Sequence, residues 1–132
     1  MPRTLAGLVA AMSFMACIHV AAAQDAGSNP PPAAAASTGY TPVNADGQIE
    51  VILKDHVFQP SEIRIPPDTP IQLLVKNQDA TADEFDSTAL RIEKVIGGGS
   101  QGIVRLRGLK PGRYPFMGEF HAATAQGVVI VE

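Results

Sequence analysis

The sequence predicts an all-β domain, a β-sandwich or barrel of about seven strands. From residue 48 onward, short apolar or alternating segments recur roughly every 8–12 residues, which is the strand spacing of such folds. Pro, Gly or Asn separates these segments, and none of them has the 3.6-residue apolar period of a helix. With 132 residues, the chain has room for one packed core.

The first three strands are expected at residues 49–55, 62–65 and 71–77. The second of these alternates strictly between polar and apolar side chains and stops at Pro66, because proline cannot continue a strand ladder. The third stops at the polar sequence Asn-Gln-Asp, residues 77–79, which is typical of a turn.

The four later strands are expected at 90–96, 102–107, 113–119 and 127–131. Three consecutive glycines, 97–99, and the sequence Lys-Pro-Gly, 110–112, supply turns between them. Two segments, 81–88 and 117–127, do not fit a strand pattern and are expected to be loops. Because binding residues concentrate on loops, a site is expected there.

The first 47 residues have a different composition. Arg3, an apolar run over 5–20 and three alanines at 21–23 predict a signal peptide of residues 1–23 and export to a periplasm. Lipoprotein anchoring at Cys17 is the alternative. The Pro/Ala-rich residues 24–47 are expected to be a disordered linker, which leaves residues 48–132 as the folded domain.

Charge and motifs exclude several classes of function. The net charge is −3 and no run of Lys or Arg occurs, which argues against a nucleic-acid partner. The sequence has no phosphate-binding Gly-x-x-x-x-Gly-Lys loop and no hydrolase or transferase motif. Cys17 is the only cysteine, so cleavage of the signal peptide would leave no disulfide and no thiolate ligand.

The order of several short motifs is distinctive. Asn-Gln-Asp at 77–79 is followed by Lys-Pro-Gly-Arg-Tyr at 110–114, then by His121 and a closing Gly-Val-Val-Ile-Val at 127–131. This order resembles the cupredoxin domain over residues 48–132, and the resemblance implies a Greek-key β-sandwich. Where blue-copper members carry their Cys ligand, this chain has Gly118. It keeps the later His as His121. Without a thiolate, a type 1 blue-copper centre is not expected.

The candidate metal ligands lie in the two expected loops. Met117, Glu119 and His121 are spaced so that an extended segment would present them on one face, and Glu84 and Asp86 are spaced likewise. The cupredoxin topology brings both loops to the same end of the domain. The resemblance therefore implies that these residues hold a copper or iron ion.

Each candidate ligand also has a structural interpretation. Met117 can pack, Glu119 can be solvated, His121 can cap a turn, and the acidic loop can be no more than a charged surface. His56 follows the first strand, where the cupredoxin pattern has no ligand, and Glu93 lies between Arg91 and Lys94. The roles of His56 and Glu93 stay open at this point.

A closer resemblance rests on five short sequences taken together: Asp-Glu-Phe-Asp-Ser, Arg-Ile-Glu-Lys-Val-Ile, Pro-Gly-Arg-Tyr, Gly-Glu-Phe-His and Ala-Gln-Gly-Val-Val-Ile-Val. They resemble the periplasmic cupredoxin component of bacterial ferrous-iron permease systems. That likeness implies a copper or iron ion, an inner-membrane iron permease and other periplasmic iron-uptake components as partners, and a role in Fe(II) oxidation or delivery. Ferroxidase-type activity would need an electron acceptor, which the sequence does not identify.

Two other functions stay open. The first is copper handling by a periplasmic copper-binding protein that has no part in iron uptake. The second is a metal-free β-sandwich that serves only as an interaction domain. A metal titration separates the metal-free domain from the other two functions.

Overall fold

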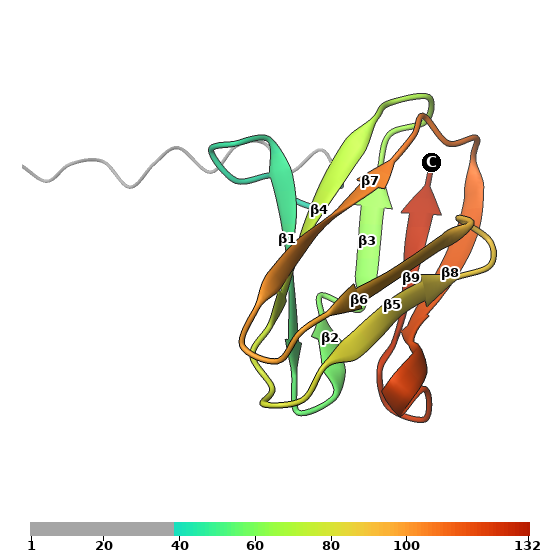
Figure 1. Ribbon diagram of the computed structural model, residues 1–132. Helices are drawn as coiled ribbons and strands as arrows, with labels where there is room; N and C mark the ends of the chain where they lie inside the picture. The colour runs from blue at the N-terminus through green and yellow to red at the C-terminus, as the bar shows by residue number, and fades with distance from the viewer. Residues whose placement is uncertain (1–38) are drawn as a thin grey trace, which may run out of the picture. The chain divides into compact units, whose positions relative to one another are not determined.

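Two β-sheets pack face to face in the computed structural model, which describes residues 39–132 (Figure 1). Their nine strands, with one 3-10 turn, are β1 (Gln48–Lys54), β2 (Val57–Gln59), β3 (Glu62–Ile65), β4 (Ile71–Asn77), β5 (Asp83–Ser87), β6 (Ile92–Ile96), β7 (Gln101–Leu106), β8 (Gly112–Gly118), η1 (Glu119–His121) and β9 (Gln126–Val131). The predicted all-β sandwich is confirmed, with two strands more than expected within residues 39–132.

The strand order is β2-β1-β4-β7 in the smaller sheet and β3-β9-β8-β5-β6 in the larger one. Strands β1 and β4 pair in parallel, as do β3 and β9, and the other pairs are antiparallel. Consecutive strands therefore often belong to different sheets. This topology brings the β1–β2 turn, the β4–β5 connection and η1 to one end of the sandwich (Figure 1).

The core lies between the sheets and consists of the inward side chains of both. Its centre holds three aromatic rings: Phe85 stacks on Phe116 with a centroid distance of 4.7 Å, and Phe58 meets both rings edge-on. Each of these side chains is at most 2% exposed. The three phenylalanines come from β2, β5 and β8, so they connect the two sheets directly beneath the end where the site is expected.

Strand β5 corrects the expectation of an acidic loop at 81–88. Residues 83–87 alternate in burial, with Asp83, Phe85 and Ser87 inward and Glu84 and Asp86 outward. Phe85 fixes this register, because its ring fills the core. The two inward polar residues keep hydrogen-bond partners, since Ser87 Oγ donates to the Pro115 carbonyl at 2.6 Å and Asp83 accepts from backbone amides.

The expected linker, 24–47, is described only from Gly39 onward. There, the Thr41 amide donates to the Arg64 carbonyl and the Arg64 amide donates to Thr41 Oγ1, so this part of the chain lies against β3. The expected signal peptide and the rest of the linker lie outside the described residues. Within residues 39–132, no helix is long and apolar enough to cross a membrane.

Candidate metal centre

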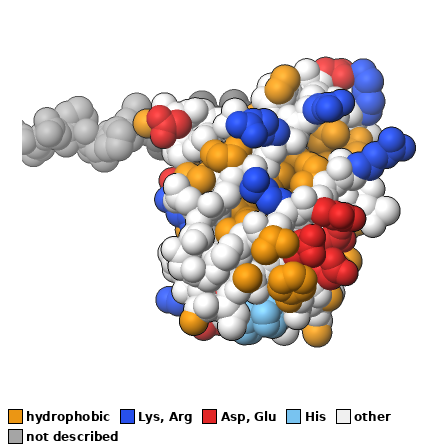
Figure 2. Space-filling view, in the orientation of Figure 1, with side chains coloured by type: hydrophobic (Ala, Val, Ile, Leu, Met, Phe, Trp, Pro, Cys, Tyr) orange, Lys and Arg blue, Asp and Glu red, His pale blue; other side chains and the backbone are white. Residues whose placement is uncertain are grey.

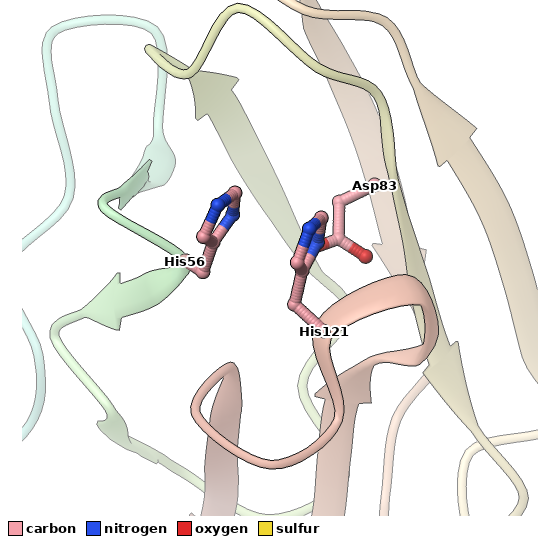
Figure 3. A group of neighbouring side chains, drawn as sticks. All are labelled: His56, Asp83 and His121. Atoms are coloured by element: carbon pink, nitrogen blue, oxygen red, sulfur yellow. The ribbon is translucent and has the colours of Figure 1, made fainter.

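Three side chains from distant parts of the sequence meet at one end of the sandwich. His56 comes from the β1–β2 turn, Asp83 begins β5, and His121 ends η1 (Figure 3). Each offers one potential ligand atom, and these atoms all lie within 4.8 Å of one another. Within residues 39–132, no other group of three His, Cys, Asp or Glu residues comes as close together. This cluster is the candidate metal centre.

The backbone of a two-residue turn holds His56 in place. Asp55 and His56 have φ angles of 52° and 57°, which is the left-handed geometry of the tight hairpin turns that match strand twist. The Asp79 carboxylate accepts both of their amides, at 2.7 and 2.9 Å. The hydrogen bond from the His56 amide is the main cause that lowers the pKa of Asp79, so this carboxylate stays charged beside the site.

A buried carboxylate orients His121. Asp83 Oδ2 lies 2.9 Å from His121 Nδ1, and Asp83 Oδ1 accepts the amides of Glu84 and Phe120 at 2.8 and 3.1 Å. The Asp83 side chain is only 3% exposed, so these bonds fix its position. A neutral imidazole that donates its Nδ1 hydrogen to Asp83 keeps its Nε2 lone pair free, and carboxylates hold metal-bound histidines in the same way.

The two imidazole rings face one another. Their centroids are 3.6 Å apart and their planes differ by 9° (Figure 3). His56 Nδ1 is buried and has no hydrogen-bond partner, although Asp79 Oδ2 lies 3.3 Å away. A buried nitrogen without a partner is unfavourable unless something else binds it. The site therefore combines an unused imidazole nitrogen, a second oriented imidazole and a carboxylate.

This donor set fits a transition metal of intermediate softness. Imidazole suits copper, iron, zinc and nickel, and two histidines with one carboxylate is a known set for iron. The side chains of His56 and His121 are 40% and 29% exposed, so the site lies at the surface of the domain, with the His56 Nδ1 atom on its inner side. Asp83 can act as a ligand itself or keep His121 oriented, and the same geometry serves both roles.

Gly118, at the position where blue-copper proteins carry Cys, has no room for a side chain. A Cβ atom there would lie 2.7 Å from Asp83 Oδ2 and 2.7 Å from the Ala125 Cβ. The Asp83 carboxylate thus lies where a thiolate side chain would begin. A metal ion at this place would therefore meet a carboxylate and no sulfur ligand.

The other predicted ligands lie on the outer face of the larger sheet. The carboxyl groups of Glu84 and Glu119 lie close enough to interact, and Asp86 stands opposite both Glu93 and Met117 in the strand register. We call these five residues the acidic cluster. The structure brings four of the five predicted ligands together there, whereas the fifth, His121, pairs with Asp83.

The 3-10 turn explains why His121 does not lie on the outer face of the larger sheet with the acidic cluster. An extended segment would have placed Met117, Glu119 and His121 on one side, but β8 ends at Gly118 and residues 119–121 turn. The expectation that these three residues share one extended face is therefore wrong. The turn directs the imidazole toward Asp83 and His56.

The acidic cluster makes a pH-dependent contribution to stability. The pKa of Glu84 is raised, mainly by desolvation and then by its hydrogen bond and charge interaction with Glu119. Its charged form is disfavoured in the folded state, so stability is lost as pH rises through this pKa. We expect Glu84→Gln to raise the melting temperature at pH 7 and to have little effect at pH 4, below the ordinary Glu pKa of 4.5. Calorimetry at both pH values, with Asp46→Asn, an exposed acidic residue that forms no ion pair within residues 39–132, as control, checks this; equal shifts at both would contradict it.

His56 and Asp83 were not among the predicted ligands. Asp83 could have been found from Phe85, the aromatic residue of that segment. Residues two apart on a strand share a face, so an inward Phe85 also places Asp83 inward. His56 could have been found from its place in the sequence. Only two residues separate the end of β1 from the start of β2, so His56 must lie in a tight turn at the end of the sandwich.

Comparison with known proteins agrees with this fold. A family model described as a cupredoxin-like domain matches residues 8–131. An uncharacterized protein of Rickettsia prowazekii (strain Madrid E) is 39% identical over 84 residues, which cover 64% of this chain and 67% of that protein.

Two solved structures have similar folds. One is the metal-binding domain of the Streptococcus pneumoniae D39 Cu(I)-exporting P-type ATPase CopA with Cu(I), with 16% identity, a TM-score of 0.57 and coverage of 68% of this chain and 91% of that one. The other is auracyanin A, a blue copper protein from Chloroflexus aurantiacus, with 14% identity, a TM-score of 0.56 and coverage of 64% and 98%. At these identities the likeness concerns the fold.

Proposed function

The chain belongs to the family of cupredoxin-like domains, and we propose that it binds one copper or iron ion through His56, His121 and Asp83. The observation that carries this proposal is the pair of facing imidazoles, one with an unpartnered buried nitrogen and the other held by a buried carboxylate. A metal ion would use the His56 nitrogen, which has no hydrogen-bond partner among the described residues.

Copper is the ion we favour. For a given set of nitrogen and oxygen ligands, Cu(II) binds more tightly than the other divalent ions of the first transition series. The CopA domain and auracyanin A, whose folds are similar, are copper proteins by their descriptions, which supports the same choice. When bound, such an ion would supply one-electron redox chemistry. The protein residues would hold it, keep His121 oriented and leave one side open to solvent.

In this proposal the acidic cluster attracts cations to the domain. Its carboxylates gather on the outer face of the larger sheet, between the basic side chains and the His side chains in Figure 2. Such a field raises the local concentration of cations and steers them toward a nearby site. In this proposal Glu84, Asp86, Glu119 and Met117 attract or receive the ion, and His121 is the predicted ligand that retains it.

For the biological role, we propose export to a periplasm and assistance to iron uptake, by binding a metal or delivering it to an iron permease. The resemblance of the short motifs to permease-associated cupredoxins supports this role. Copper handling is the second candidate, and the copper-binding structural relatives favour it. Uptake of radioactive iron by cells with and without the gene separates the two: an unchanged rate with raised copper sensitivity would favour copper handling.

The lack of a thiolate gives a spectroscopic prediction. We expect the Cu(II)-loaded protein to be nearly colourless, because the intense visible band of blue-copper proteins requires a copper–cysteine bond. Absorption spectroscopy during titration with one equivalent of Cu(II) measures this, and the Rickettsia relative expressed in parallel provides a comparison. An intensely blue protein would refute the assigned ligands, and a protein that takes up no metal would support the interaction-domain alternative.

A further inference from the structure

A hollow remote from the candidate metal centre lies between strands β6 and β7. These consecutive strands belong to different sheets and form the open edges of both, so the sandwich is not closed by pairing there (Figure 1). The hollow has a volume of about 430 Å³, within the range of about 300–1,000 Å³ typical of small-molecule sites. Its lining contains no acidic residue.

The floor of this hollow is apolar. It is formed by Leu90, Ile92, Leu106 and Leu109. Leu106 is buried, whereas the other three are half-buried and pack on the core with one side uncovered. An occupant with a hydrocarbon part would cover this surface, and the free energy gained would scale with the apolar area removed from water.

The rim carries three guanidinium groups, those of Arg91, Arg105 and Arg107. Within residues 39–132, Arg64 is the only arginine that forms an ion pair, so none of the three is paired with a carboxylate. Arg91 also lines a neighbouring hollow that contains Asp86 and Glu93, whereas Arg105 and Arg107 do not. Arg105 belongs to β7, Arg107 comes directly after that strand, and Arg91 comes directly before β6; all three line the hollow. Figure 2 shows apolar surface exposed between Lys and Arg side chains on this side of the domain.

Arg91 reaches the rim through an unusual backbone. Its φ angle is 57°, which L-residues other than Asn and Asp rarely adopt. Its amide donates to the Thr88 carbonyl at 3.3 Å, which closes the turn before β6. Glycine would adopt this conformation with less strain, so an arginine at position 91 makes the backbone energetically less favourable.

We propose that this hollow binds an anionic amphiphile, a carboxylate or phosphate group that bears a short hydrocarbon chain. Guanidinium groups bind carboxylate and phosphate in pairs of hydrogen bonds, which accounts for the three arginines. A bare inorganic anion would leave the apolar floor uncovered, and a neutral hydrocarbon would leave the arginines without a partner. A nucleic acid is disfavoured by the net charge of −3.

Nuclear magnetic resonance titration of the ¹⁵N-labelled protein tests the proposal. The probes are decanoate and decyl phosphate below their micelle concentrations, with a neutral decyl glycoside and inorganic phosphate as matched controls. We expect both anionic amphiphiles to shift the amides of residues 90–92 and 105–109, and to bind at least tenfold more tightly than either control. The tighter of the two identifies the headgroup.

Three variants sharpen the test. The double variant Arg105→Gln and Arg107→Gln should weaken amphiphile binding at least tenfold and leave Cu(II) binding unchanged. Arg91→Gly should also weaken it, while its melting temperature stays equal or rises, because the strained backbone is relieved. Lys54→Gln removes one positive charge from the end of β1, which lies beside the end of β4 away from the hollow, and should have no effect.

Several outcomes would overturn the proposal. They are equal binding of the neutral and anionic amphiphiles, undiminished binding by the arginine variants, or amide shifts confined to other parts of the domain. Self-association in sedimentation velocity that the double variant abolishes would instead assign the hollow to a second copy of the chain.

Discussion

His56→Ala and His121→Ala are each expected to lower the affinity for Cu(II) at least tenfold, equivalent to about 1.4 kcal/mol. Each substitution removes one of the two imidazoles that face each other at the end of the sandwich. The loss of His56 also removes the unpartnered buried nitrogen, and the loss of His121 leaves Asp83 without its imidazole. Neither ring belongs to the core, so the fold should persist.

Isothermal titration with Cu(II) measures this effect. Thr124→Ala is the matched control, because Thr124 is an exposed neighbour at the same end whose hydroxyl contacts only the His121 carbonyl. Full affinity in both histidine variants, with loss of affinity in Glu84→Gln or Glu119→Gln, would move the ion to the acidic cluster. Thermal melting of each variant shows whether a loss of affinity reflects unfolding.

Phe85→Ala is expected to cost about 3–5 kcal/mol of unfolding free energy, which is usual for the loss of a buried aromatic ring. Phe85 is 1% exposed and contacts the rings of Phe58 and Phe116 at the centre of the core. A domain of this size is stabilised by about 5–15 kcal/mol in total, so the variant would lose a large fraction of its stability.

Urea denaturation of the purified protein checks this value. Phe120→Ala is the control, since that ring is 54% exposed and its removal should change the stability by less than about 0.5 kcal/mol. A loss below about 1 kcal/mol for Phe85→Ala would contradict the assigned register of β5 and, with it, the inward position of Asp83.

The sandwich could be predicted because its long strands carry their own signals. Alternation at 62–65 and the turn sequences at 97–99 and 110–112 are local features, and the strands they delimit occur in the structure. Strand β5 carries no such signal. Its Asp and Glu residues disfavour strands, and only the packing of Phe85 against Phe116 makes the segment extended.

The metal centre was predictable only in part for a related reason. The resemblance pointed to His121, which lies in the candidate centre, but the residues beside it depend on the direction of side chains after a turn. The 3-10 turn at 119–121 and the inward register of Asp83 are consequences of tertiary packing. His56 was left without a role, although the parallel pairing of β1 with β4 brings its turn beside Asp79 and the last loop.

The most direct test of the metal centre is a count of the imidazole nitrogens bound to the ion. Pulsed electron paramagnetic resonance of the Cu(II)-loaded protein detects the remote nitrogen of each coordinated histidine. We expect two imidazoles in the wild-type protein and one in each of His56→Ala and His121→Ala. A wild-type spectrum that shows no coupled imidazole, or that both variants leave unchanged, would contradict the assignment of the ion to His56, His121 and Asp83.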